Sequence, residues 1–120
     1  MKLLATILVL FVAISHVGIL MLEMFYWDHE VGRKVFAMTA EQSANTAILA
    51  MNQGLYNGFL AAGLFWGVIT KRFDVKVFFL ACVIVAGVFG AATAKESILF
   101  TQAMPAAIAL LFVYLSNRKA

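Results

Sequence analysis

The sequence has little charge and few of the residues that cross-link or break a chain. Only 12% of its 120 residues are charged, and it has one proline and one cysteine. Soluble domains are about one-quarter charged, so this composition excludes a soluble single domain. A lone Cys82 excludes a disulfide scaffold, and the scarcity of charge and proline excludes a disordered chain. With 64% hydrophobic residues, the chain is expected to be an integral membrane protein.

Four apolar stretches predict four transmembrane helices. They cover about residues 3–25, 46–70, 77–93 and 98–115. A hydrocarbon core of about 30 Å needs about 20 helical residues, and flanking residues extend the two shorter stretches to that length. Thr39 and Gln42 have the spacing of a capping box, which offers the second helix an earlier start near Ala40. The predicted fold is an all-α, four-helix transmembrane bundle, with one membrane domain over residues 1–120.

The positive charges predict the orientation of these helices. Six basic residues fall on one side, namely Lys2, Lys71, Arg72, Lys76, Arg118 and Lys119, and three fall on the other, namely Arg33, Lys34 and Lys95. Because basic loops stay inside, both termini are expected in the cytoplasm and the 28–45 loop outside. The first apolar run continues to Trp27, which favours an uncleaved signal anchor over a cleaved secretory signal.

The basic flanks also account for the net charge of +3. Charges at the ends of membrane spans set orientation and touch anionic lipid, so no nucleic-acid partner is expected. The expected location is the cell (inner) membrane, with a multi-pass topology, and the expected partner is the lipid bilayer. A homodimer is a further expectation.

Polar residues inside the apolar stretches are the most informative feature, because they are costly in a membrane. His16 and Glu23 are seven residues apart and share one face of the first helix. In the second helix, four polar residues fall within about 140° of the helix surface when each residue is given about 100°. These four are Asn52, Gln53, Tyr56 and Asn57, named here the polar stripe.

Small residues mark a second kind of helix face. Gly54 and Gly58 lie opposite the polar stripe, and Ala86 and Gly90 form a similar face in the third helix. Such faces allow close backbone approach, so we expect them to pack together, either within one chain or across a dimer. In the fourth helix, Pro105 removes a backbone donor, which predicts an irregularity near Thr101.

Combining depth with orientation predicts a polar pocket in the outer half of the bundle. The candidate ligand-binding residues are His16, Glu23, Asn52, Gln53, Tyr56, Asn57, Thr93 and Gln102. No metal-ligand motif is present, and the sequence identifies neither a cofactor nor catalytic residues. Purely structural interpretations stay open. Single amides in membrane helices often form interhelical hydrogen bonds. The side chain of Glu23 could extend to the membrane interface.

Several of these residues together resemble a known family. The residues are His16, Glu23 and Trp27, the block at 52–61, the segment 86–90 with Thr93, and Gln102 with Pro105. They resemble the domain of unknown function 1304 family, which are small four-span proteins, mostly bacterial. The resemblance covers nearly the whole chain and implies an architecture without an activity. The layout of four spans with a carboxylate in the first is also similar to small multidrug resistance transporters, although their local motifs are absent around Glu23.

Three functional hypotheses follow from the residues. The first is binding or transport of a small molecule or ion, with Glu23 and His16 as protonatable groups. The second is a membrane-embedded enzyme on a lipid-like substrate, with Glu23 or His16 as base and Tyr56 as acid. The third is a structural or assembly subunit of a membrane complex. Whether the protein is an enzyme is left open by the sequence.

Overall fold

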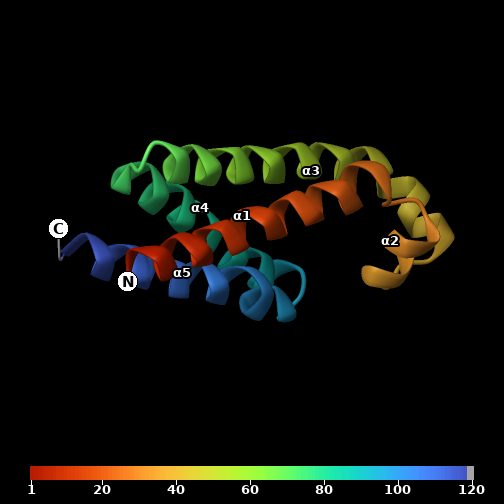
Figure 1. The fold of residues 1–120 in the computed structure, drawn as a ribbon. Helices are drawn as coiled ribbons and strands as arrows, with labels where there is room; N and C mark the ends of the chain where they lie inside the picture. The colour runs from red at the N-terminus through yellow and green to blue at the C-terminus, as the bar shows by residue number, and fades with distance from the viewer. Residues whose placement is uncertain (119–120) are drawn as a thin grey trace. The chain divides into compact units, whose positions relative to one another are not determined.

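The computed structural model describes residues 1–118, and this part of the chain is helical without strands (Figure 1). The elements in chain order are α1 (Lys2–Phe25), α2 (Glu30–Val35), α3 (Ala40–Ile69), α4 (Phe73–Thr93), the π-helix η1 (Leu99–Ala103) and α5 (Met104–Arg118). The prediction of an all-α fold is therefore confirmed for the described residues. The short α2 falls within the segment that we expected to be a loop.

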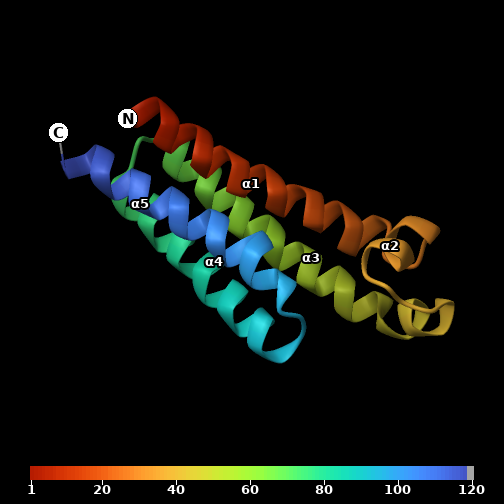
Figure 2. The same ribbon diagram turned by 90° about the horizontal axis from the view of Figure 1, so that it is seen from below.

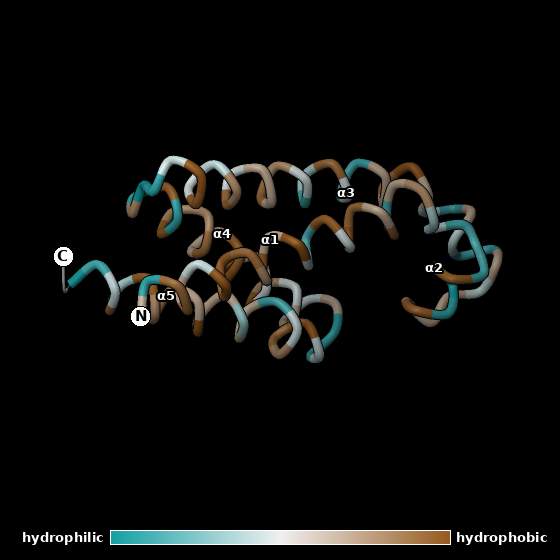
Figure 3. The backbone as a smooth tube through the Cα atoms, viewed as in Figure 1, coloured by the Kyte–Doolittle hydropathy of each residue, from teal (hydrophilic) through white to brown (hydrophobic). Residues whose placement is uncertain are grey.

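Three helical segments are long and apolar enough to cross a membrane. They are α1, α4 and the continuous segment Leu99–Arg118, which joins η1 to α5. The fourth expected span corresponds to α3, which has 30 residues but carries the polar stripe and is less apolar. Figure 3 shows the contrast between the predominantly hydrophobic α1 and α4 and the hydrophilic connections. A fourth span and the orientation of the termini remain predictions.

The start of α3 shows how the sequence sets a helix boundary. The Thr39 N–H donates to Gln42 Oε1 at 2.9 Å, and the Gln42 N–H donates to Thr39 Oγ1 at 3.1 Å. These are the two reciprocal bonds of a capping box, which satisfy donors that a helix end leaves unpaired. The helix begins at Ala40 directly after this box.

Contacts divide the chain into two compact units, which are described separately. The first unit contains Met1–Ile14 and Leu60–Ala120, and the second contains Ser15–Phe59. The core of the first unit is made of small and branched apolar side chains, namely Ala5, Val9, Val12, Ala13, Leu64, Leu80, Val83, Ala106, Ala109 and Val113. Within this unit, α4 and α5 run side by side (Figure 2).

The first unit has an irregular helix where the sequence predicted one. The Met104 N–H reaches the Leu99 carbonyl, which is the longer i→i+5 spacing of a π-helix. Pro105 follows directly and has no N–H to continue the α-helical pattern into this turn. Gly87 of α4 lies against this segment, because a Cβ atom there would come within 2.7 Å of the Ala103 nitrogen. A glycine is therefore needed for α4 and η1 to approach so closely.

The second unit pairs the later part of α1 with the earlier part of α3. A Cβ at Gly58 would lie 2.7 Å from Leu20, and one at Gly54 would lie 2.5 Å from Met24. The small-residue face of α3 is therefore packed against α1. Leu20 and Met24 fill the space that the two glycines leave open. The sequence predicts packing on the small-residue face of the 77–93 helix, within one chain or across a dimer. Within this chain, Gly90 faces Ile98 and Ala86 is exposed, so packing of the two faces across a dimer stays a prediction.

Candidate functional site

The second unit brings one carboxylate and one amide together between two helices. The Asn57 side-chain amide donates to Glu23 Oε1 at 2.6 Å, and the same nitrogen lies 3.2 Å from the Gln53 carbonyl. Glu23 is partly buried and stands two residues before the end of α1, while Asn57 lies in the second half of α3. The short bond is consistent with a charge-assisted hydrogen bond to a carboxylate.

Helix geometry explains why Asn57 alone of the polar stripe reaches Glu23. Stepping about 100° per residue from Asn52 puts Asn57 at about 140° and Gly54 at about 200°. Asn57 therefore borders the small-residue face that packs on α1. A Cβ at Gly54 would also lie 3.1 Å from the Glu23 Cβ. The absence of a side chain at Gly54 therefore allows the two helices to come close enough for this hydrogen bond.

The rest of the polar stripe is directed elsewhere. Asn52 is exposed and donates to the carbonyl of Ile48 in its own helix at 2.9 Å. Tyr56 is 57% exposed, and its ring lies 6.1 Å from that of Phe59. Gln53 is exposed as well, although its carbonyl accepts from Asn57. We expected Asn52 and Tyr56 to converge on the carboxylate of Glu23, but the contacts of these two side chains are with their own helix.

The remaining predicted site residues differ in their surroundings. His16 is buried, at 2% exposure, and lies two turns before Glu23 on α1 of the second unit. Thr93 is exposed at the end of α4, where its hydroxyl donates to the Phe89 carbonyl at 2.7 Å. Gln102 is partly buried within η1. Both Thr93 and Gln102 belong to the first unit, so the site described here is confined to Glu23 and Asn57 with His16 nearby on the same helix.

The connection between α1 and α3 holds a cluster that the sequence analysis missed. The Trp27 indole N–H donates to the Thr46 hydroxyl at 2.9 Å, and the Trp27 ring lies 4.7 Å from that of Phe36. Gly32 is buried against the backbone carbonyls of Tyr26 and Trp27. Trp27 therefore ties the end of α1 to both α2 and α3. The only sequence signal was an aromatic residue at the end of a span, which alone predicts an interfacial anchor.

A polar network reinforces this connection. Arg33 forms an ion pair with Asp28 at 3.0 Å, and the Ser43 hydroxyl donates to the same carboxylate oxygen at 2.7 Å. Ser43 is fully buried at the start of α3, whereas the ion pair is partly exposed. The side chains of Asp28, Arg33 and Ser43 bond to one another, which indicates a structural clamp rather than a reactive centre. It connects the segment after α1 to the start of α3, the two helices that carry Glu23 and Asn57.

The chemistry available at the site is limited to proton exchange and the binding of cations or polar groups. Within residues 1–118, no group of three or more His, Cys, Asp or Glu side chains is arranged to hold a metal ion. Glu23 supplies one carboxylate, and Asn57 supplies a neutral amide that donates to it. The acid–base pair proposed between Glu23 and Tyr56 has no contact to support it, because Tyr56 packs on Phe59.

Taken with the geometry of the site, the fold defines an all-helical protein with three segments able to cross a membrane. Residues 10–114 match the family described as "Protein of unknown function (DUF1304)". The chain belongs to this family. It is also similar to "Uncharacterized protein YpaA" of Lactococcus lactis subsp. lactis (strain IL1403), with 30% identity over 115 residues that cover 92% of this chain and 97% of that protein. No solved structure matches the chain.

Proposed function

We propose that this protein is a multi-pass membrane protein that binds a small cation or protonated small molecule at the Glu23–Asn57 pair, as part of binding or transport. The observation that carries the proposal is the 2.6 Å hydrogen bond between these side chains, which joins the apolar α1 to α3. An ionisable residue within a membrane helix is costly and is most often retained for function. A ligand that interacts with this carboxylate would offset that cost.

The charge of the pair supports a cationic ligand. Both ion pairs of the described residues involve other groups, Arg33 with Asp28 and Arg72 with Asp74, so no basic side chain neutralises Glu23 there. Asn57 is an amide and donates a hydrogen bond without supplying a positive charge. A proton or a cation would complete the site, and His16 on the same face of α1 is a second group able to exchange a proton.

The test of this proposal is ligand-dependent stabilisation of the purified full chain. Sodium, potassium and a series of alkylammonium ions are titrated in a zwitterionic detergent at several pH values while thermal stability is followed. A ligand that binds only the folded state raises the midpoint of unfolding with concentration. We expect at least one cation to do so, and we expect Glu23→Gln to abolish the effect, because it keeps the size of the side chain and removes its charge.

Glu41→Gln is the matched control. Glu41 is exposed in the first turn of α3, so this variant makes the same chemical change away from the site. The control should respond to cations as the wild-type chain does. If Glu23→Gln and Glu41→Gln respond to cations alike, the stabilisation depends on the overall charge of the protein and the proposed site is wrong.

A second function, assembly with another copy of the chain, is supported by the exposure of the polar stripe. Asn52, Gln53 and Tyr56 are all exposed in the single chain. If α3 crosses the membrane, their polar groups would face lipid unless another helix covers them. The side-chain amides of Asn52 and Gln53 both donate and accept, so the same stripe on a second copy would be complementary.

Replacing the two amides tests the assembly function. The double variant Asn52→Leu with Gln53→Leu should convert a dimer to a monomer in mass measurements of nanodisc-embedded protein. Ile48→Ala with Leu49→Ala serves as a control, since it alters exposed apolar residues of the same helix. A wild-type chain that is monomeric at all concentrations would exclude a homodimer.

The proposed location is the cell inner membrane, with both termini in the cytoplasm. This orientation is supported by the positive-inside rule. It is also supported by the first unit, where Lys2, Lys71, Lys76 and Asn117 line one cavity and so lie at one end of that unit. The starts of α1 and α4 and the end of α5 are thereby on the same side.

A further inference from the structure

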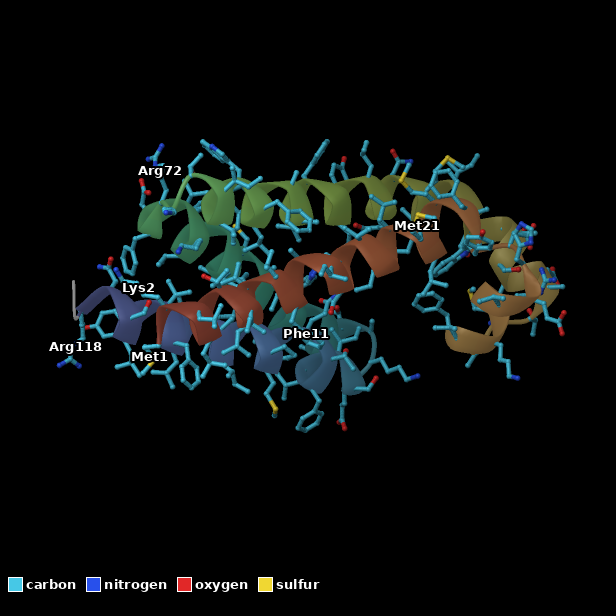
Figure 4. All side chains as sticks on the ribbon, viewed as in Figure 1. Met1, Lys2, Phe11, Met21, Arg72 and Arg118 are labelled. Atoms are coloured by element: carbon cyan, nitrogen blue, oxygen red, sulfur yellow. The ribbon has the colours of Figure 1, made fainter. Side chains whose placement is uncertain are left out.

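A basic cavity lies at the end of the first unit where α1 and α4 begin. Its volume is about 470 Å³, which is within the range of small-molecule sites. Three lysines line it together with hydroxyl, amide and apolar groups, and the lining residues include Lys2, Lys71, Lys76, Thr6, Ser116 and Asn117. Figure 4 shows Lys2 at the same end as Arg72 and Arg118. Among the described residues 1–118, those that line the cavity include no acidic residue.

The three lysines are not neutralised by a carboxylate of the described residues. Among the described residues, the acidic group nearest in sequence, Asp74, is paired with Arg72 at 2.6 Å, and no carboxylate is paired with a cavity lysine. The hydrogen bond to Asp74 and the charge of this carboxylate hold the pKa of Arg72 above its usual value. Three like charges around one space repel each other, and an anion bound between them would remove that repulsion.

The ends of four helices meet at the cavity, two of them N-termini and two of them C-termini. The first turns of α1 and α4 both contribute lining residues, Leu3 and Phe73 among them. The N-terminus of a helix carries a partial positive charge and unpaired N–H groups, which favour anions such as phosphate. The last turns of α3 and α5 also line the cavity, through Val68, Ser116 and Asn117, and their partial negative charge opposes that of the two starts. The positive charge of the cavity therefore comes from its lysines.

The backbone at Lys71 allows the side chain of this residue to be removed without straining the turn. Lys71 has a φ of 56°, a left-handed conformation in which glycine is favoured. The Lys71 N–H bonds the Val68 carbonyl and the Arg72 N–H bonds the Gly67 carbonyl, the two bonds of a Schellman motif. Glycine would fit this turn with less strain, but it would remove a lysine from the cavity.

We propose that this cavity binds a phosphate group, carried by an anionic phospholipid headgroup or by a soluble phosphate. Lysine is a point charge suited to phosphate oxygens, and basic pockets between membrane helices bind anionic headgroups in this way. The apolar lining residues Val68, Phe73 and Val113 give the cavity a surface that suits the non-phosphate part of a lipid. This site belongs to the first unit and is independent of the Glu23–Asn57 proposal.

Two arms of one binding experiment distinguish the two sources of phosphate. In the first arm, delipidated full-length protein in zwitterionic detergent is titrated with inorganic phosphate by calorimetry. In the second, protein in phosphatidylcholine nanodiscs receives increasing phosphatidylglycerol, and bound lipid is counted by native mass spectrometry. We expect saturable binding in at least one arm. An absence of saturable binding in both arms would overturn the proposal.

Lys71→Gly is the most informative variant, because it separates binding from folding. Replacing Lys71 by glycine relieves the left-handed backbone, so the thermal stability should be unchanged or higher. The affinity for phosphate or phosphatidylglycerol should fall about fivefold, the effect of one lysine near an anionic surface. Lys2→Gln should weaken binding to a similar extent.

Lys95→Gln provides the control for general charge. Lys95 is exposed between α4 and η1 and does not line the cavity, yet this variant changes the net charge by the same amount as Lys2→Gln. Its affinity should match that of the wild-type chain. If Lys95→Gln weakens binding as much as Lys2→Gln and Lys71→Gly do, the effect is one of overall charge and the cavity is not the site.

Discussion

Single residues in the α1–α3 connection control how the second unit holds its site. Trp27 contacts Thr46 and Phe36, and Gly32 lies under the carbonyls that flank Trp27. These contacts fix the end of α1 and the start of α3, and therefore the helices that carry Glu23 and Asn57. Few side chains are buried in this connection, so its conformation depends on a few close contacts.

Gly32→Ala should be among the most damaging substitutions in this connection. A Cβ at residue 32 would meet the Tyr26 carbonyl and lie 2.5 Å from the Trp27 carbonyl oxygen, and neither backbone group can move aside cheaply. We expect a loss of about 3 kcal/mol in the free energy of unfolding, the upper range for overpacking. Lys34→Ala in the same helix is exposed and should change it little. Equal thermal midpoints for the two variants would contradict this packing.

At the scale of elements, the polar stripe of α3 lies differently from the prediction, whereas the small-residue face of this helix is a packing face, with α1 as its partner. Polar residues in a span usually face the bundle interior, so the polar stripe was predicted to be inside. Instead, Gly54 is buried against α1 and Asn52 is exposed. The glycine face packs on α1 in the single chain because it permits close backbone approach. Burying an amide requires a hydrogen-bond partner, and Asn57 of the stripe has one on α1, the carboxylate of Glu23.

The candidate site was therefore only partly predictable. The sequence identified Glu23 and Asn57 as members of one set, and the structure joins them through a hydrogen bond. It could not identify which stripe residue would face α1, because that depends on which face of α3 packs. It also missed the clamp formed by Asp28, Arg33 and Ser43, since these residues are separated along the chain and carry no motif.

The contact between α4 and η1 predicts a strict requirement for glycine at residue 87. A Cβ there would lie 2.7 Å from the Ala103 nitrogen and 2.9 Å from its Cβ, which are backbone and rigid atoms. Gly87→Ala should therefore lower the free energy of unfolding by roughly 2 kcal/mol. The measurement is thermal unfolding in detergent.

Gly18→Ala is the matched control for Gly87→Ala. Gly18 lies inside α1, and a Cβ there would meet nothing within 4 Å. Because alanine favours a helix more than glycine does, this variant should gain up to about 1 kcal/mol. A Gly87→Ala variant as stable as Gly18→Ala would show that α4 and η1 do not approach so closely.

At the scale of the whole molecule, the fold class and most helices were predictable. A long apolar segment in lipid must satisfy its own backbone hydrogen bonds, and a helix does so. The capping residues Thr39 and Gln42 also marked where α3 begins. The short α2 was not predictable, since it is held by the packing of Gly32 rather than by an apolar period. The number of spans stays a prediction because the polar stripe lowers the hydropathy of α3.

The topology of the whole chain is tested by reporters at two positions. Reporter fusions after Ala120 and within the 28–45 segment should give opposite signals, with the C-terminal fusion in the cytoplasm. This outcome follows if α1, α3, α4 and the segment Leu99–Arg118 all cross the membrane. The same signal from both positions would mean that α3 does not cross.

The central claim is that the Glu23 carboxylate of the apolar α1, which accepts a hydrogen bond from Asn57 of α3, is a functional site that exchanges a proton or cation. The most direct test is labelling of native membranes with a hydrophobic carbodiimide, which attacks protonated carboxyl groups from the lipid phase, followed by peptide mass spectrometry. The account predicts that Glu23 is labelled in preference to the exposed Glu41, and that a cation bound at the site slows the reaction. Failure to label Glu23, or equal labelling of Glu41, would contradict it.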